Sequence, residues 1–166
     1  MTTDREPLAK ILPAVMTELR WRPLFTFFIQ IRKPYVVGKT PAVDRRIGDI
    51  TGGHFEGERL SGRIISGNDW QNVRSDGAWM IGVRALLETD DSALIGMCYQ
   101  GLRHGPKDVL DALGRGEAVD PRAYYMRVTV TFETASERHG FLNNIIAVAD
   151  GHRLAQGAIY NVFEIT

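Results

Sequence analysis

The chain has 166 residues, with 20 Lys and Arg against 20 Asp and Glu, so its formal net charge is zero. That balance gives no sequence-wide attraction to phosphate backbones, and it predicts no nucleic-acid partner. A single cysteine excludes an internal disulfide, and no apolar run reaches the ~18–20 residues of a membrane span. We therefore expect a cytoplasmic protein with a full apolar core and no membrane partner.

Residues 1–23 predict a tail with one short helix, and residues 24–166 predict a single domain. Apolar residues recur at helical spacing from Leu8 to Leu19. Pro13 lies inside this pattern, so we expect the helix to break there, because proline cannot donate to the helical ladder.

From Leu24 onward the hydrophobic pattern changes to a period of two, which is typical of strands with one buried face. The alternation is clearest in Tyr124–Thr134. Strands are predicted over residues 24–37 with an interruption at Pro34, and over 79–87, 94–102, 124–134, 141–149 and 158–165. The polar residues 150–153 predict the turn that joins the last two strands.

One further stretch, Pro106–Leu113, predicts a short helix, with proline in its first turn. The glycines of Gly48–Gly67 predict that two adjacent strands bend around a barrel corner. Gly38-Lys39-Thr40 lacks the earlier glycine that a phosphate-binding loop requires. These patterns predict a mainly β fold, an antiparallel barrel or sandwich with one or two short helices.

The four histidines are too widely spaced in the sequence to form a local pair of metal ligands. We therefore expect neither a metal nor a cofactor. His54 differs from the others because it follows two glycines and precedes Phe55, and it is a candidate for substrate binding. Cys98, between two apolar neighbours, predicts a buried structural thiol.

Ser66–Trp70 places a carboxylate next to a large aromatic residue. An acid beside an aromatic ring is typical of the rim of a small-molecule pocket. If the Trp70 ring removes water from Asp69, the pKa of Asp69 rises toward the range of a general acid or base. The alternative is that residues 68–69 form an ordinary turn and that Trp70 packs in the core.

Arg84 and Arg127 each lie in the middle of a predicted strand, between apolar neighbours. Inside a barrel each arginine would need a carboxylate partner or an anionic ligand, because an unpaired buried charge is costly. Tyr125 shares the strand face of Arg127, so a phenol and a guanidinium could together stabilise charge that develops on an oxygen. The alternative is that these residues belong to the solvated outer face.

An ordered series of short motifs extends along most of the chain. It comprises Gly38-Lys39-Thr40-Pro41, Arg46, Gly52-Gly53-His54-Phe55-Glu56-Gly57, Leu60-Ser61-Gly62, Gly67-Asn68-Asp69-Trp70, Asp76-Gly77, Arg84, Leu87-Glu88-Thr89-Asp90-Asp91, Tyr124-Tyr125-Met126-Arg127, Phe132-Glu133-Thr134 and Leu142-Asn143. This series resembles the UPF-type proteins of the "domain of unknown function 3237" family over nearly everything after Leu24.

The resemblance implies a small antiparallel β-barrel, similar to the allene oxide cyclase and dirigent barrels, that assembles as a homo-oligomer, a dimer or higher. It also implies that a set of residues from these motifs acts together at one pocket. That set is Arg46, Asp69, Trp70, Arg84, Tyr125, Arg127 and Asn143. The resemblance implies no particular reaction, because a fold alone does not determine a function.

We therefore expect a small-molecule enzyme without a tightly bound cofactor, which transfers protons on an apolar or aromatic carbonyl or acid substrate. Isomerases, cyclases and lyases carry out such chemistry. Asp69 is the predicted general acid or base, and Tyr125 with Arg127 or Arg84 is predicted to bind oxyanion charge. The predicted substrate-binding residues are Arg46, His54, Trp70, Trp79, Tyr99 and Asn143.

Two other hypotheses remain open from the sequence. The first is a non-catalytic barrel that binds a small molecule as a carrier or sensor. The second is a structural barrel whose arginines form only interface ion pairs, and it predicts a filled interior with no ligand-sized cavity.

Overall fold

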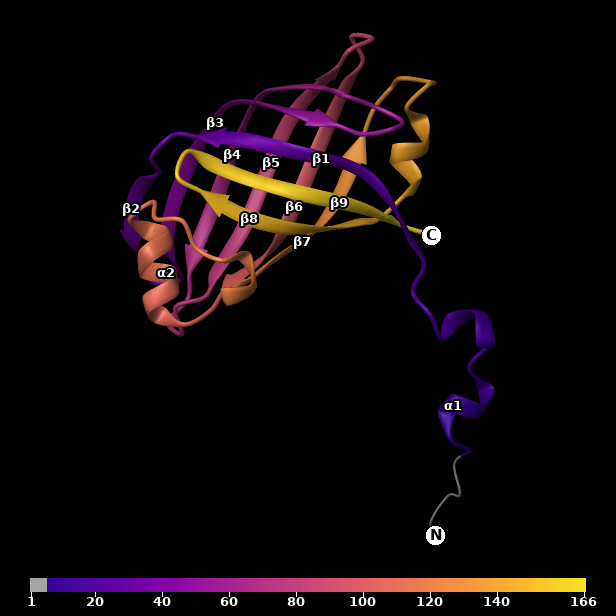
Figure 1. Cartoon of the computed structure of the whole chain (residues 1–166), viewed down its shortest axis with the longest axis horizontal. Helices are drawn as coiled ribbons and strands as arrows, with labels where there is room; N and C mark the ends of the chain where they lie inside the picture. Colours follow the sequence, from indigo (N-terminus) through magenta and orange to yellow (C-terminus); the bar gives the residue numbers. More distant parts are fainter. Residues whose placement is uncertain (1–5) are drawn as a thin grey trace.

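The computed structural model describes residues 6–166, so the first five residues of the predicted tail lie outside it. Its strands are β1 (Trp21–Ile31), β2 (Tyr35–Lys39), β3 (Asp44–Glu56), β4 (Gly62–Val73), β5 (Trp79–Thr89), β6 (Leu94–His104), β7 (Tyr125–Glu133), β8 (Ala147–Leu154) and β9 (Gly157–Ile165). Within residues 6–166 these strands form one antiparallel sheet, and an added pairing of β1 with β3 closes it into an eight-stranded barrel (Figure 1). The predicted fold class is confirmed.

Short helices lie outside the barrel wall. They are α1 (Leu8–Ile11), α2 (Lys107–Gly114) and three 3₁₀ turns, η1 (Ala14–Met16), η2 (Pro121–Ala123) and η3 (Gly140–Asn144). Pro13 separates α1 from η1, as predicted, and this N-terminal segment extends away from the barrel (Figure 1). The helix α2 follows Pro106, as predicted, and lies at one end of the barrel.

The barrel closes along β3. Both β1 and β2 pair with this strand, with Ile31 opposite Ile50 and Tyr35 opposite Ile47, so the two strands continue one another across the interruption predicted at Pro34. Gly53 lies where β1 approaches most closely, since a Cβ built there would lie 2.2 Å from the Phe28 carbonyl oxygen. A side chain at this position would separate the two strands, so glycine is required for closure.

The side chains of the core pack inside the lumen from alternating positions of the strands. In β7 the residues from Met126 to Phe132 with even numbers are buried, and the odd-numbered residues are exposed. Aromatic rings fill the middle of the lumen, where Phe27 stacks on Tyr160 with 4.8 Å between ring centroids.

The predicted strand over residues 141–149 is wrong except for its last three residues, which begin β8. Residues 140–144 form η3, and β8 begins at Ala147 and continues through residues 150–153, which were predicted to be a turn. The inward positions of β8 start with alanines and a glycine, so the apolar alternation there is weak and easily mistaken for a turn. Cys98 was predicted to be buried, but its side chain lies on the exposed outer face of β6.

Candidate functional site

A cavity of about 260 Å³, here called the central cavity, lies in the lumen at the α2 end of the barrel. Inward side chains from several strands form its wall, including Ile81, Met126 and Ala158. Leu110 and Leu113 of α2 line another side. The helix and the barrel wall together therefore enclose a space of ligand size, whose polar groups are described below.

A β-bulge in β4 directs Asp69 into this cavity. Ile64 pairs with Leu87 and Ser66 pairs with Leu86, so one residue is extra on β4. An extra residue reverses the alternation of all residues that follow it. As a result Asp69 is buried, with 4 % of its surface exposed, whereas Trp70 is 50 % exposed on the outer face.

The Asp69 carboxylate is only partly hydrogen-bonded. Its Oδ2 accepts a hydrogen bond from the Gln71 side-chain amide. Its Oδ1 is buried and has no hydrogen-bond partner within residues 6–166. Burial raises the pKa of Asp69 above that of an ordinary aspartate, and the Gln71 amide, the Gly82 backbone N–H and the charges of Arg103 and Arg153 oppose part of this rise. The group can therefore exchange a proton at a higher pH than an exposed carboxylate.

Two arginines, Arg103 of β6 and Arg153 of β8, line the same cavity. The guanidinium carbon of Arg103 lies 4.5 Å from the centroid of the Trp79 ring, and Arg153 donates a hydrogen bond to the Gly157 carbonyl oxygen. Burial lowers the pKa of both arginines, and the positive charge of Arg153 lowers that of Arg103 further. Among the described residues, neither arginine forms an ion pair with a carboxylate.

Tyrosines border the deep part of the cavity. Tyr160 of β9 lines it, and Tyr99 lies behind Tyr160 with 5.3 Å between the ring centroids. Gly151 makes room for Tyr160, since a Cβ there would lie 2.6 Å from the tyrosine ring. Burial raises the pKa of both phenols, so each keeps its O–H donor at neutral pH.

The family model described as "Protein of unknown function (DUF3237)" matches residues 19–165. The chain belongs to this family. A UPF0311 protein of Clostridium acetobutylicum is 32% identical over 151 residues, which cover 90% of this chain and 96% of the relative. The resemblance inferred from the sequence motifs is thus confirmed.

Solved structures share the barrel of this DUF3237 member. A beta-barrel like protein from Acinetobacter baumannii is 41% identical, with a TM-score of 0.78 over 90% of this chain and 97% of that one. A protein described as an enzyme from Penicillium herquei has a TM-score of 0.70 over 93% of this chain and all of its own, at 21% identity. At that identity the similarity shows the fold alone.

Three residues predicted as substrate-binding lie at or beside the central cavity. Arg46 and Trp79 line it, and the Arg46 guanidinium carbon is 5.4 Å from the Trp79 ring centroid. Tyr99 is 1% exposed and packs behind Tyr160. Together with Asp69, these are the predicted site residues that the structure of this family member brings together.

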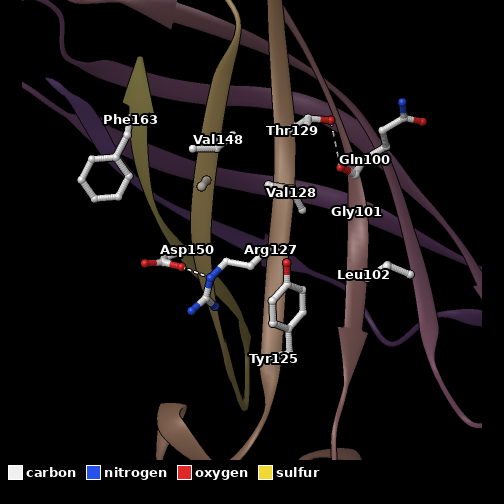
Figure 2. A pocket seen from close by; sticks show the side chains of 11 residues that line it. Gln100, Gly101, Leu102, Tyr125, Arg127, Val128, Thr129, Val148, Asp150 and Phe163 are labelled. Atoms are coloured by element: carbon white, nitrogen blue, oxygen red, sulfur yellow. Dashed lines mark hydrogen bonds and ion pairs between the residues drawn. The ribbon is translucent and has the colours of Figure 1, made fainter. Parts of the chain in front are cut away.

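The predicted oxyanion-binding residues lie elsewhere. Arg84, Tyr125 and Arg127 are exposed on the outer face, which is the alternative left open by the sequence. Figure 2 shows Arg127 beside Asp150, with which it forms an ion pair, and Tyr125 next to it in an outer groove of about 430 Å³. This groove is larger than the central cavity but open to solvent, and its charges are already paired. These three side chains therefore cannot act together with Asp69.

Three more predicted residues also lie away from the cavity. His54 and Trp70 are exposed on the outer face of the barrel. Asn143 lies in η3 and holds a loop, because its side chain accepts from the Thr134 amide at 2.8 Å and donates to the Thr134 carbonyl at 2.9 Å. The role of Asn143 in the structure is thus to order the segment between β7 and β8.

Sequence reasoning missed five polar residues that line the cavity, which are Lys33, Gln71, Arg103, Arg153 and Tyr160. Arg103 lies one residue beyond the predicted strand 94–102, on the same face as Tyr99. Arg153 lies in the predicted turn, on the same face as Ala149. Extending the predicted strand 94–102 to the Gly105-Pro106 turn signal would have found Arg103. Arg153 follows Asp150-Gly151, which is itself a typical turn signal, so this extension would not have found it.

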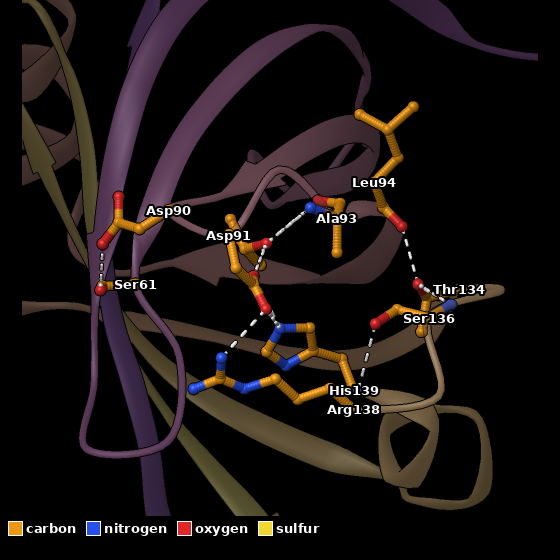
Figure 3. A network of polar contacts seen from close by, with 10 residues as sticks. Ser61, Asp90, Asp91, Ala93, Leu94, Thr134, Ser136, Arg138 and His139 are labelled. Carbon is orange, nitrogen blue, oxygen red and sulfur yellow. Dashed lines mark hydrogen bonds and ion pairs between the residues drawn. The ribbon is translucent and has the colours of Figure 1, made fainter.

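A second polar cluster lies at the opposite end of the barrel, where the buried His139 and Thr89 contact Asp91 and Arg138 at the surface (Figure 3). His139 is 2% exposed, and its Nε2 lies 3.0 Å from Asp91 Oδ1. Asp91 also accepts hydrogen bonds from the Thr89 hydroxyl and from Arg138, the latter at 3.2 Å. These contacts hold the loop before η3 against the turn between β5 and β6, so the cluster seals this end of the barrel.

Within residues 6–166, no three His, Cys, Asp or Glu side chains are grouped so that they could hold a metal ion. In the same residues, none of the helices is both long and apolar enough to cross a membrane.

Proposed function

We propose that this protein is a small-molecule enzyme that transfers protons within the central cavity, with Asp69 as the general base and acid. One observation carries the proposal: a buried carboxylate has an oxygen without a protein partner in a cavity of about 260 Å³. Buried polar groups are nearly always hydrogen-bonded, and exceptions concentrate at functional sites. The substrate class is an apolar or aromatic compound with a carbonyl or acid group.

The chemistry follows from the groups around Asp69. Ionised Asp69 removes a proton from a carbon next to a carbonyl group, and the electron pair of the broken C–H bond moves onto the carbonyl oxygen. In this mechanism the Tyr160 O–H, which lines the same cavity and stays protonated at neutral pH, donates a hydrogen bond to the enolate oxygen. Asp69 then returns the proton to another carbon, which is an isomerisation, or a leaving group departs, which is an elimination.

This proposal changes the residues that carry the predicted mechanism. Tyr160 takes the role that the sequence suggested for Tyr125, because Tyr160 lines the cavity and Tyr125 is exposed. Ile81, Met126 and Ala158 supply apolar walls that limit water near the reacting carbon. None of these roles requires a cofactor. The cavity also favours this proposal over a structural barrel, for which a filled interior was expected.

Proton exchange at carbon tests the proposal without knowledge of the natural substrate. Phenylacetone and phenylpyruvate are incubated in D₂O with the wild type, with Asp69→Asn and with the outer-face control Asp150→Asn. NMR then measures the loss of the proton next to the carbonyl. We expect the wild type and the control to accelerate exchange, and Asp69→Asn to lose about 10²–10⁴-fold of that acceleration.

Equal exchange rates in the wild type and Asp69→Asn would refute the role of Asp69. Saturable binding of a probe with no exchange above that of buffer would favour the carrier or sensor instead. Assembly into a homo-oligomer, a cytoplasmic location and the lack of nucleic-acid and membrane partners stay predictions.

A further inference from the structure

The central cavity carries an excess of positive charge. Four basic side chains line it, Lys33, Arg46, Arg103 and Arg153, against one acidic side chain, Asp69. Arg46 is paired at 3.0 Å with Asp44, and the sequence position of Lys33 places it next to the solvated segment between β1 and β2. The imbalance is therefore concentrated on the two deeper arginines.

Arg103 is held in place but not neutralised. Its Nε is buried and has no hydrogen-bond partner within residues 6–166. Its guanidinium stacks on the face of Trp79, 4.5 Å from the ring centroid. A ring face orients a guanidinium and partly stabilises its charge, but it leaves the in-plane N–H donors free. These donors are therefore available to a ligand.

Arg153 is positioned through its backbone. The Arg153 amide donates a hydrogen bond to the Tyr124 hydroxyl at 2.7 Å, and that hydroxyl lies 2.9 Å from His152 Nδ1. The side chain donates one hydrogen bond to the Gly157 carbonyl oxygen. A guanidinium has five N–H donors, so several donors of Arg153 lack a protein acceptor.

Two neighbouring guanidiniums without carboxylate partners are costly to bury. An anion that binds between the two guanidiniums offsets this cost, because a carboxylate accepts charge-assisted hydrogen bonds from both. Asp69 offsets this charge only in part, because its carboxylate attracts both arginines from a distance but forms no ion pair with either, and its bonded oxygen faces Gln71.

The register shows where such an anion would lie. Asp69 pairs with Val83, and Val83 pairs with Tyr99, so these three residues lie at one level of the barrel. Arg103 follows Tyr99 by four residues along β6. At about 3.3 Å per residue, the Arg103 backbone lies about 13 Å nearer the α2 end than Tyr99. Gly151 lies opposite Tyr160, and Arg153 follows Gly151 by two residues along β8. Arg153 therefore also lies nearer the α2 end than Tyr160 does. The arginines thus surround the path between the α2 end and Asp69.

We propose that Arg103 and Arg153 bind a carboxylate group of the substrate, so that the ligand of the central cavity is a small organic acid whose reactive carbon extends toward Asp69. This inference rests on the proposed function only for the direction of the reactive carbon. The volume of about 260 Å³ falls below the roughly 300–1,000 Å³ of drug-sized pockets, which favours a compact acid such as a substituted aromatic or keto acid.

Binding of benzoate against benzamide tests the charge requirement, because the two probes have nearly the same shape. Titration calorimetry and Trp fluorescence at constant ionic strength measure the affinity of the wild type, Arg103→Gln and Arg153→Gln. Arg84→Gln and Arg127→Gln are matched controls, since both arginines are exposed on the outer face. We expect benzoate to bind and benzamide not to, and each cavity variant to weaken benzoate by about 10- to 100-fold. The controls should stay within about twofold of the wild type.

Folding is checked by thermal unfolding without ligand. Arg103→Gln and Arg153→Gln should unfold at or above the wild-type temperature, because each removes an unpaired buried charge. Equal affinity for benzoate and benzamide, an absence of millimolar benzoate binding, or undiminished binding by folded cavity variants would each overturn the inference. Tighter binding of inorganic phosphate than of benzoate would also overturn it, in favour of a phosphate ligand.

Asp69→Asn separates this inference from the proposed function. The substitution removes a negative charge near the arginines, so it should leave benzoate affinity unchanged or increase it. If the wild type binds benzoate but catalyses no proton exchange, the proposed function fails and the anion site stands. If exchange depends on Asp69 but benzoate does not bind, the anion site fails and the proposed function stands.

Discussion

At the α2 end of the barrel, Asp69 has one unpartnered oxygen, and Arg103 and Arg153 lack carboxylate partners. At the opposite end, Asp91 is bonded to Thr89, Arg138 and His139. Both clusters contain an aspartate beside cationic or polar groups. They differ in how completely the hydrogen-bonding capacity of the aspartate is used within the chain.

The pKa values follow this difference in opposite directions. Burial raises the pKa of Asp69, whereas the hydrogen bonds from Thr89 and His139 lower that of Asp91 to about 2. A satisfied cluster stabilises the fold and has no donors left for a ligand. An unsatisfied one is retained at a cost to stability, which indicates a ligand or a reaction. The comparison therefore supports the function proposed for the central cavity and a structural role for the cluster around Asp91.

The largest effect on folding is expected at the satisfied end. His139→Ala removes a buried side chain and leaves Asp91 without one of its partners, so the free energy of unfolding should fall on the order of 1–3 kcal/mol. Urea unfolding measures this change, with the exposed His54→Ala as control. Benzoate binding at the central cavity should be unchanged in the folded protein, and its loss would show that the two ends are coupled.

At the α2 end of the barrel, a substitution of Asp69 is expected to stabilise the fold, by less than the loss expected for His139→Ala. Because the pKa of Asp69 is raised on folding, the native state binds more protons than the unfolded state between the two pKa values, and stability falls as the pH rises through that window. Asp69→Asn removes this loss, so it should stabilise the protein at pH 7 by about 1 kcal/mol, or about 2–4 °C in Tm. The gain should shrink as the pH falls through that window, since Asp69 then becomes protonated in the native state. A variant that unfolds more easily at pH 7 would show that Asp69 is structural.

The smallest effect is an acid dependence at Asp91. Its pKa is lowered on folding from 3.8 to about 2, so its contribution to stability is complete above about pH 4 and is lost as the pH falls toward 2. The difference in Tm between the wild type and Asp91→Asn should therefore be largest at pH 5 and shrink toward pH 2. Circular dichroism measures both melting curves. A constant difference across this range would contradict the role assigned to the carboxylate.

Most of the fold could be predicted because the pattern that specifies a strand is local. The alternation in Tyr124–Thr134 predicts that Met126 and Arg127 point to opposite faces of the sheet. In β7 Met126 is buried and Arg127 is exposed, as this alternation requires. The segment over residues 140–153 could not be predicted in this way. Its inward positions are small or charged, so the alternation loses contrast there.

The site was only partly predictable. The sequence singled out Asp69 because Trp70 follows it. In the structure the Trp70 ring lies on the outer face, so Asp69 is buried by the barrel and not by that ring. Arg103 and Arg153 come from strand ends that are far apart in the sequence, and their proximity depends on how the barrel closes. No local pattern contains that information.

The sequence by itself determined which residues of each strand share a face, because side chains of a strand alternate with a period of two whatever the strand packs against. Only the tertiary structure decided which face turns inward. The extra residue of β4 between Ile64 and Ser66 reverses the alternation, and barrel closure then makes one face the lumen. The buried Asp69 and two half-buried arginines line the lumen together for that reason, while Arg84 and Arg127 are exposed on the outer face.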